Sequence, residues 1–209
     1  MSSRSRRSGG RFSGPEFVAR LRARDPEALR EVAEAYLPQI LRAARAAGLD
    51  AQRAEDVAQA TLAAFVERAA HFEGRSHVRT FLFGILYHKL AQSQREAARN
   101  DREDPIDETV AQRFAPDGSW QRPPRPADAD VYAAEIVELV ERGLAELPFK
   151  QRMAFLLREV HGFTTGEICN ILQVSGTHVG VLLFRARNRL REYLEAHGVR
   201  GPRGAGGGA

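Results

Sequence analysis

Apolar residues recur every three or four positions along much of this chain, which is the spacing of one face of an α-helix. A first helix is expected to begin at Asp25-Pro26, because Asp caps helices well and Pro suits their first turn. Pro38 falls inside this stretch and should kink or split it, and Gly48 should end it. The repeating apolar positions are Leu29, Val32, Ala33, Tyr36, Leu37, Ile40, Leu41 and Ala44.

Two further helices are expected before residue 100. Asp50 can cap one that runs to about Ala70, and another covers residues 76 to about 100. These elements predict a first helical domain over residues 15–100. The preceding residues 1–14 are rich in Ser, Gly and Arg and are predicted to form a disordered basic arm.

Residues 101–130 break the helical pattern. They hold five of the ten prolines, eight acidic residues and four arginines, without a sustained apolar period, and predict an acidic, Pro-rich linker. Helical periodicity resumes over residues 131–197, and a flexible tail follows over 198–209. The inward positions expected there before Gly162 are Val137, Val140, Leu144, Leu147, Met153, Leu156, Leu157 and Val160. No alternating strand pattern is present, so the predicted fold class is all-α, with two small helical domains on a tether.

Composition limits the classes of function. The net charge is only +4, but 29 of the 31 basic residues are arginine, whose planar fork suits phosphates and guanines. Cys169 is the only cysteine, so an intramolecular disulfide and a cysteine-built zinc site are excluded. No apolar run approaches the roughly 20 residues of a membrane helix, and the basic start lacks the apolar stretch of a secretory signal. A cytoplasmic protein without membrane insertion is expected.

The strongest local motif covers residues 164–194. Thr164 and Glu167 have the spacing of a capping box, and a short helix, a turn with Ser175 or Thr177 as cap, and a longer helix follow. This order is the helix-turn-helix layout. Four arginines crowd the last helix, and Thr177 and His178 at its start are candidates for reading bases. The alternative interpretation is an arginine-rich face that is merely solvated. The four are Arg185, Arg187, Arg189 and Arg191.

The middle helix of the first domain, residues 51–69, carries apolar residues on nearly every side. A surface helix with one core should show one stripe, so a second apolar side suggests a partner. A central helix buried within its own bundle explains the pattern equally well. Asp56 and Gln59, three positions apart, share a face on which a partner could be contacted.

Residues 71–82 mix aromatic residues with arginine and glycine. Rings can stack on unpaired bases while cations hold the backbone, so this stretch is suited to single-stranded nucleic acid. The alternative is an ordinary loop whose Phe72 and Phe81 fill the core, and Phe81 is expected to do so.

The two motifs together resemble those of extracytoplasmic-function (ECF) sigma factors of the sigma-70 family. Residues 147–190 are similar to the family's region 4, and the sequence Glu-Asp-Val-Ala-Gln at residues 55–59 is similar to the start of the clamp-binding helix of region 2. The matching region 4 residues are Leu147, Pro148, Arg152, Glu167, Ile168, Arg185, Ala186 and Arg187. The chain departs from the family's usual residues at His88, Gln92, Cys169, Gly180, Val181 and Leu182. Base preferences therefore cannot be carried over, and contacts near Val181 could be apolar.

The resemblance implies an alternative sigma factor that binds core RNA polymerase, recognises and melts promoter DNA, and directs transcription initiation. It implies no cofactor, metal or catalytic residue, and an anti-sigma factor as a further partner. The residues implied in core polymerase binding are Asp56, Gln59, Leu62, Ala63, Val66 and Glu67. Those implied at the minus-ten element are His71, Phe72, Arg75, Ser76, Arg79, Phe83, Tyr87 and His88. Those implied at the minus-thirty-five element are Ser175, Thr177, His178, Val181, Arg185, Arg187 and Arg189.

Two other classes of function compete with this one. A free-standing helix-turn-helix regulator would need a dimer interface or an effector pocket, and the first domain shows no heptads and no ligand motif. An enzyme could use Glu55-Asp56 or the acids of residues 101–107 as metal ligands. The histidines show no metal-binding spacing, and no phosphate loop or nucleophile elbow is present.

Overall fold

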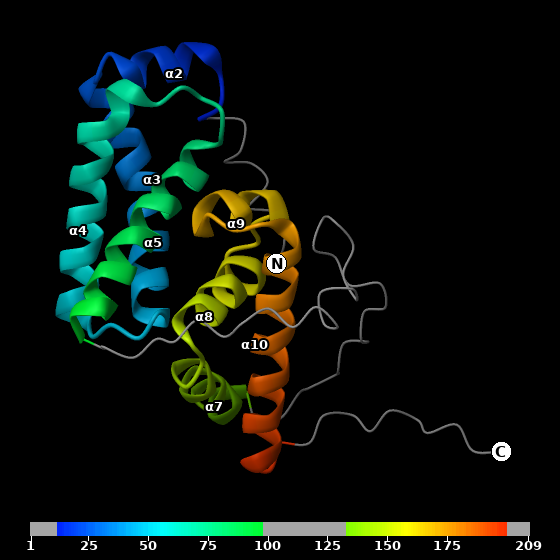
Figure 1. The fold of residues 1–209 in the computed structure, drawn as a ribbon. Helices are drawn as coiled ribbons and strands as arrows, with labels where there is room; N and C mark the ends of the chain where they lie inside the picture. The colour runs from blue at the N-terminus through cyan, green and yellow to red at the C-terminus, as the bar shows by residue number, and fades with distance from the viewer. Residues whose placement is uncertain (1–11, 98–132, 200–209) are drawn as a thin grey trace.

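The computed structural model describes residues 12–97 and 133–199, and these fold into two helical units (Figure 1). The first contains α2 (Pro15–Arg22), α3 (Pro26–Ala46), α4 (Ala51–Arg68), the 3-10 turn η1 (Ala69–His71) and α5 (Val78–Ala97). The second contains α7 (Ala133–Ala145), α8 (Phe149–Phe155), the π-helical turn η2 (Leu156–Val160), α9 (Thr165–Leu172) and α10 (Gly176–Ala196). No strand occurs in either described range, so the all-α prediction is confirmed.

Helix α2 was not predicted as a helix. Pro15 lies in its first turn, and Phe17 and Leu21 form its buried side. Phe12, which the sequence places in the basic arm, is 2% exposed and lies 5.1 Å from the Phe17 ring and 5.5 Å from that of Tyr36. The predicted arm therefore extends too far, since the core begins at Phe12.

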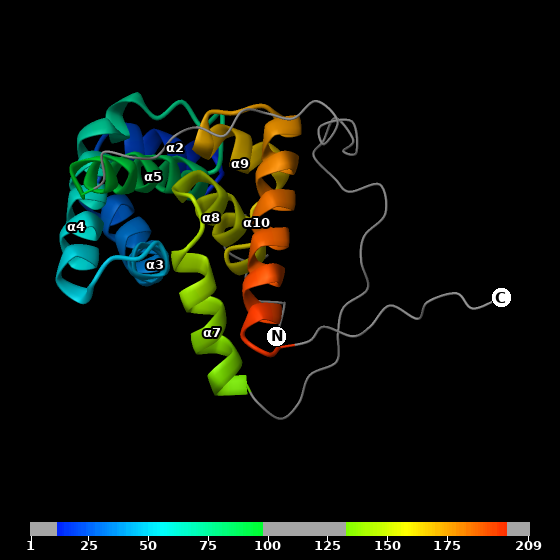
Figure 2. The ribbon, with the colours of Figure 1, turned by 60° about the horizontal axis from the view of Figure 1, so that its bottom comes forward.

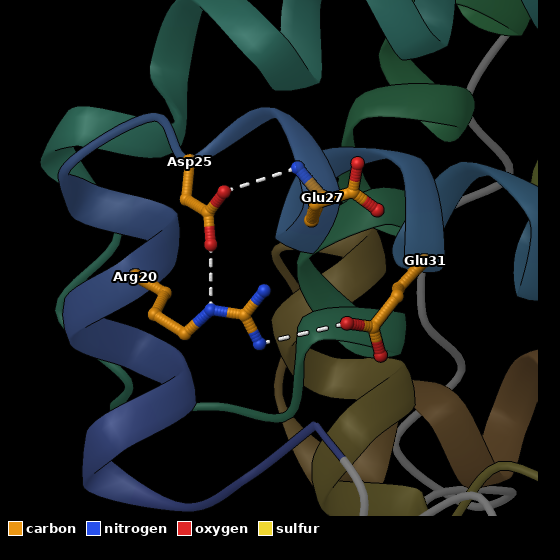
Figure 3. Close-up of polar contacts among 4 residues, drawn as sticks. All are labelled: Arg20, Asp25, Glu27 and Glu31. Atoms are coloured by element: carbon orange, nitrogen blue, oxygen red, sulfur yellow. Dashed lines mark hydrogen bonds and ion pairs between the residues drawn. The ribbon is translucent and has the colours of Figure 1, made fainter.

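The junction of α2 and α3 is fixed by polar contacts (Figure 3). Asp25 caps α3 by accepting a hydrogen bond from the Glu27 backbone N–H at 3.1 Å. Arg20 on α2 donates to the other Asp25 oxygen at 2.6 Å and also reaches Glu31 at 3.5 Å. The hydrogen bond from Arg20 lowers the pKa of the Asp25 carboxyl. The predicted cap of α3 is thus confirmed, and it also ties α3 to α2.

Helix α3 continues through Pro38, so of the two outcomes predicted there, a kink or a split, the split is wrong. Proline removes one backbone donor, but the buried positions Val32, Tyr36 and Ile40 continue in one stripe on both sides of it. Gly48 follows the helix with φ +99°, a backbone conformation that favours glycine, and its predicted role at the end of α3 is confirmed.

Helix α4 begins as predicted, with Asp50 accepting from the Arg53 N–H at 2.8 Å. Helices α3, α4 and α5 lie side by side in the first unit (Figures 1 and 2). Val32, Ile40, Phe65, Leu82 and Leu86 are each no more than 1% exposed at their shared core.

The second unit contains the predicted helix-turn-helix. Thr164 and Glu167 form both hydrogen bonds of a capping box, and Ser175 caps α10 by accepting from the His178 N–H at 3.2 Å. The axes of α9 and α10 are bent by 95° at the turn between them, within the usual range for this motif. The inner stripe of α10, predicted from its spacing, is buried.

Two apolar residues of the second unit were predicted inward but face solvent. Val160 is 60% exposed because the π-helical turn η2 adds a residue to the helical repeat, and His161 takes the buried place. Val137, near the start of α7, is 56% exposed. A pattern read at 3.6 residues per turn misplaces Val160 for this reason.

Candidate nucleic-acid and partner interfaces

The outward face of α4 carries most of the residues predicted to meet a partner. One stripe along the helix contains Asp56, Gln59, Ala63, Val66 and Glu67, and all five are exposed. Val66, the large apolar side chain among them, is 42% exposed. Leu62 is partly buried and packs against the core instead. The helix therefore buries one side in the core and exposes the other, and the exposed side is mainly polar.

The segment between α4 and α5 presents a mixed set of the residues predicted to contact the minus-ten element. His71 and Arg75 are exposed, Ser76 is half-buried, and Arg75 is ion-paired with Glu73. Phe72 is 4% exposed, with its ring centroid 5.2 Å from that of Phe81, so it fills the core as the alternative interpretation expected.

Helix α2 lies against this segment. Gly74 has φ +72°, and a Cβ built on it would lie 3.3 Å from a methyl group of Val18. Arg24 also donates to the Glu67 carbonyl at 2.9 Å, at the end of α4. The backbone of the loop is thus held against a helix that the sequence pattern did not reveal.

The last predicted minus-ten residues lie along α5. His88 is exposed, Arg79 is half-buried, and Phe83 and Tyr87 are buried. The second unit covers Phe83: its ring centroid lies 4.8 Å from that of Phe163 and 5.0 Å from that of His161. Tyr87 stacks on Phe149 at 5.6 Å with an interplanar angle of 9°. Two of the aromatic rings expected to meet DNA therefore meet the other unit.

Arg79 lies at the centre of this contact. Its guanidinium donates to the His161 carbonyl at 2.6 Å and to the Gln39 side-chain oxygen at 3.1 Å. It also lies 4.0 Å from the centroid of the Phe163 ring, within cation–π range. Burial lowers the pKa of Arg79, although the Tyr36 and Glu167 side chains oppose the shift.

Two further polar contacts join the two units. Thr80 donates to a Glu167 carboxylate oxygen at 3.1 Å, while Thr164 donates to the other oxygen. Burial works against the charge of Glu167, but these hydrogen bonds and that from the Thr164 backbone outweigh it and lower its pKa. Arg152 of α8 donates to the Ala47 carbonyl after α3 at 2.7 Å. Glu167 and Arg152, both in the region 4 pattern, thus bind the first unit.

At the start of α10, the residues predicted to contact the minus-thirty-five element are at least partly exposed. Ser175 is exposed, and Thr177 and His178 are half-buried in the first turn. Further along, Arg185 is half-buried and Arg189 exposed, on the same side of the helix as His178. Val181 is 1% exposed, so the outward position expected for it is not seen in this structure.

Arg187 lies on a different side of α10, where it pairs with Glu159 of η2 at 2.5 Å. The pair is partly exposed, at 40% for each side chain, and a surface pair of this type contributes little to stability. Its effect on charge is local: Glu159 neutralises one of the arginines that the sequence assigns to DNA.

Replacing Glu159 with glutamine should raise the affinity of the protein for duplex DNA about two- to threefold at low salt, since one released arginine adds roughly one phosphate contact. The gain should shrink as salt increases. Fluorescence anisotropy with a labelled 30-base-pair duplex would measure it. Glu138→Gln on α7 removes the same charge from a carboxylate that is 72% exposed. An equal gain in both variants would show a general charge effect and contradict the assignment of Arg187.

His161 has a buried imidazole side chain at the contact between the two units. It is 7% exposed, and its Nε2 is buried without a hydrogen-bond partner among the described residues. Burial lowers the pKa of His161 to about 4, with the cations Arg79 and Arg42 acting in the same direction. Because an ordinary histidine titrates near 6.5, the unfolded chain binds a proton here at a higher pH than the folded chain does.

The free energy of unfolding should therefore fall as the pH drops from about 6.5 to about 4, by at most about 3 kcal/mol from this residue. His161→Leu should flatten that part of the pH profile, whereas His71→Leu, at an exposed histidine, should leave it unchanged. Urea unfolding at pH 7, 5.5 and 4.5 would compare the three proteins. A His161→Leu profile as steep as that of the wild type would contradict the prediction.

No local pattern in the sequence points to the residues that contact Arg79, Phe83 and Tyr87. Gln39, Phe149, His161 and Phe163 are distant in the chain and fit ordinary core or loop positions.

Comparison with known proteins agrees with this division into units. Residues 32–100 match the family model for sigma-70 region 2, and residues 138–190 match that for sigma-70 region 4. The chain is 33% identical over 186 residues to the ECF RNA polymerase sigma factor SigD of Mycobacterium tuberculosis, covering 87% of this chain and 84% of the relative. It is 28% identical over 151 residues to a probable RNA polymerase sigma factor of Haemophilus influenzae, covering 69% and 78%.

Two solved structures share the fold. CnrH, solved in complex with the cytosolic domain of CnrY, superposes with a TM-score of 0.62 at 19% identity, over 86% of this chain and 96% of that one. The sigma factor RpoE of Bartonella quintana, solved with the anti-sigma factor NepR, gives 0.58 at 23% identity, over 79% and 96%.

The matches to both sigma-70 regions, in the order of the two helical units, show that the chain is a sigma-70-type transcription factor. Within that class, it belongs to the ECF sigma factors, and as an alternative sigma factor it directs transcription initiation. The free-standing regulator is not favoured. In the described ranges no single helix is long and apolar enough to cross a membrane, and only the bent pair α9 and α10 would pass that test together.

Proposed function

We propose that three surfaces of this chain each bind a different partner of a sigma factor: core polymerase, the minus-ten element and the minus-thirty-five element. The exposed stripe of α4 (Asp56, Gln59, Ala63, Val66 and Glu67) docks on core polymerase. The residues His71, Arg75, Ser76, Arg79, Phe83, Tyr87 and His88 contact the minus-ten element. Ser175, Thr177, His178, Arg185, Arg187 and Arg189 contact the minus-thirty-five element. The observation that carries the proposal is the α4 stripe: Asp56 and Gln59, in the helix that matches region 2, share one exposed face with Val66, and the other side of the helix is core.

The chemistry of each surface suits its proposed role. A partly apolar helix face matches a protein partner, since interface cores lose charge and bury apolar side chains. Histidine, arginine and aromatic rings match unpaired bases, and the capped start of α10 matches the edges of a major groove. Each surface is small, so the protein alone should hold promoter DNA weakly, and polymerase would supply the rigid scaffold that lets both act together.

The protein acts in the cytoplasm and without catalysis of its own, because polymerase makes the RNA. Two proteins of the same fold are solved with partners named CnrY and NepR, the second an anti-sigma factor. We extend that kind of partner to this chain. A protein that covers the α4 stripe would compete directly with polymerase.

Transcription with purified core polymerase tests the proposal. The full chain would be added to core enzyme from the organism that encodes it, together with genomic templates. The 5′ ends of the new RNA would then be mapped. Discrete starts that share two upstream elements, and that require this chain, are expected. If the chain neither bound core polymerase nor produced starts, while folded and free of inhibitor, the sigma role would be lost. A plasmid nicking assay with Mg²⁺ would test the competing nuclease activity at Glu55-Asp56.

A further inference from the structure

Helix α2 lies across the end of the first unit where α4 ends and the α4–α5 loop (residues 72–77) begins (Figure 1). It packs against the turn η1, and it precedes residues 32–100, which match the model for sigma-70 region 2. Val18 on α2 and Arg24 in the turn after it both contact the segment that joins α4 to α5. A part of the chain outside the region 2 match therefore touches the loop proposed to meet the minus-ten element.

The α4–α5 loop is held at three points. At its start, Phe72 is 4% exposed and fills the core. In its middle, a Cβ built on Gly74 would lie 3.3 and 3.4 Å from the two methyl groups of Val18. At its end, the Arg79 backbone N–H donates to His77 Nδ1 at 3.1 Å. The contact with Val18 is the one that fixes the middle of the loop.

The residues proposed to bind DNA lie beside this middle contact. Arg75 directly follows Gly74 in the chain, and Ser76 comes next. Gly74 has φ +72°, which favours glycine, and because it lacks a side chain its backbone can approach the Val18 methyl groups closely. A change in the shape of Val18 should therefore move the backbone that carries Arg75 and Ser76.

Arg24 holds the other end of the segment, where α4 ends. Its guanidinium donates to the Glu67 carbonyl at 2.9 Å, in the last turn of α4, where a helix lacks donors of its own. The Arg24 backbone has φ +54°, in the left-handed region that residues other than glycine rarely adopt. Such strain persists where the surrounding structure holds it, and it is concentrated at functional sites.

Helix α2 is fixed to α3, so it can serve as a rigid support. Phe17 and Leu21 are its buried residues. Arg20 donates to Asp25 at 2.6 Å and reaches Glu31 of α3 at 3.5 Å (Figure 3). Because one side of α2 is anchored to the core and another side meets the α4–α5 loop, the position of the loop follows that of the helix.

We propose that α2 and the turn after it set the position of the α4–α5 loop for the minus-ten element, with Val18 and Arg24 as positioning residues that do not themselves touch DNA. The proposal rests on the proposed minus-ten role of this loop and adds a determinant of specificity outside the region 2 match. A loop held in one position presents its side chains to the bases without first being ordered. Affinity and discrimination between bases both increase as a result.

Backbone NMR relaxation of the full chain tests the support without DNA or polymerase. Amides of the α4–α5 loop should have order parameters of about 0.85 in the wild type, falling towards about 0.6 in Val18→Ala and in Arg24→Gly. Glycine adopts φ +54° without strain, so Arg24→Gly should not lower the thermal midpoint. Val57→Ala makes the same deletion at another partly buried valine, on α4, and should leave the loop rigid. A loop that is already mobile in the wild type, or equally rigid in both α2 variants, would overturn the proposal.

Binding of DNA by the holoenzyme tests what the position of the loop does. A labelled fork-junction DNA, with the minus-ten bases of a mapped start single-stranded, is compared with one in which those bases are substituted. Val18→Ala and Arg24→Gly should each weaken binding to the mapped sequence about fivefold and reduce its advantage over the substituted one. Arg24→Lys keeps a donor for the Glu67 carbonyl and should restore both. A variant that only loses stability would bind both DNAs less tightly by the same factor.

Binding to core polymerase separates this role from the others. Val18→Ala, Arg24→Gly and Val57→Ala should bind core polymerase as the wild type does. Undiminished discrimination in both α2 variants, an equal loss of it in Val57→Ala, or a loss of core binding as large as the loss of DNA binding would overturn the positioning role. A wild-type holoenzyme that does not distinguish the two DNAs, with order parameters as expected, would instead count against the proposed minus-ten role of the loop.

Discussion

Replacing Val66 with aspartate should weaken binding to core polymerase by 30-fold or more and abolish transcription from any promoter that this chain serves. The substitution places a carboxylate at the centre of the proposed α4 docking stripe. A charge buried at an interface without a partner loses its hydration, and single central residues commonly contribute about 2 kcal/mol or more to binding. Glu67 beside it adds like-charge repulsion.

The substitution should leave the fold intact, because Val66 is 42% exposed and contributes little to the core. Val137→Asp on α7 is the matched control: the same change at a valine that is 56% exposed, outside the proposed stripe. Binding would be measured by anisotropy of the labelled protein titrated with core polymerase, and transcription on a mapped template. Normal binding by Val66→Asp, or an equal loss in Val137→Asp, would remove the α4 stripe from the proposed polymerase interface.

Measuring polymerase binding and DNA binding in Val66→Asp also separates docking on polymerase from recognition of DNA. A variant defective only in α4 should keep the contact between the two units as the wild type does, because Val66 takes no part in that contact. It should also retain the weak duplex binding expected of α10. Loss of polymerase binding together with retained DNA binding would therefore assign α4 a single role.

Features encoded within three or four residues were predictable from the sequence. The caps at Asp25, Asp50, Thr164 and Ser175 each join a side chain to a backbone N–H two or three residues ahead, and all four form as expected. The helix-turn-helix followed from the same kind of information. Its inner stripe obeys the helical period, so periodicity alone located the core of α10.

Features that depend on irregular backbone were not predictable from a fixed period. The π-helical turn displaces Val160 outward and His161 inward, although the sequence around them reads as a continuous helix. At Pro38, packing on both sides keeps α3 continuous where propensity alone predicts a kink or a split. In both places tertiary contacts override the local rule.

The sequence predicts which surfaces are candidates for binding, but it does not predict which of them are covered in the folded protein. The exposed side of α4 was foreseen because its residues form a stripe, and no distant contact is needed to define it. Arg79 and its acceptor His161 lie 82 residues apart, and no local pattern joins them. A motif indicates which side chains suit DNA. Only the packing of the two units shows that several of these side chains are buried against the other unit.

Replacing Arg152 with alanine should lower the free energy of unfolding by about 2–4 kcal/mol, because buried carbonyls would lose their donor. Arg152 is 8% exposed and donates to the carbonyls of Ala145 at 2.6 Å and Leu147 at 3.1 Å, as well as to Ala47. The Ala47 carbonyl also accepts from Gln94 at 3.2 Å. The cost should therefore fall mainly on the turn between α7 and α8.

A lysine at this position separates charge from geometry. One guanidinium serves acceptors on both units through two nitrogens, and its fit is close, since a Cβ at Gly48 would lie 2.8 Å from one of them. A single ammonium cannot occupy both places, so Arg152→Lys should recover less than half of the loss. Arg142→Ala, at an exposed arginine of α7, should change stability by less than about 0.5 kcal/mol. Urea unfolding followed by circular dichroism would compare the variants. If Arg152→Lys were as stable as the wild type, charge alone would account for the motif's arginine; if Arg152→Ala were equally stable, its three carbonyl contacts would have no part in holding the fold.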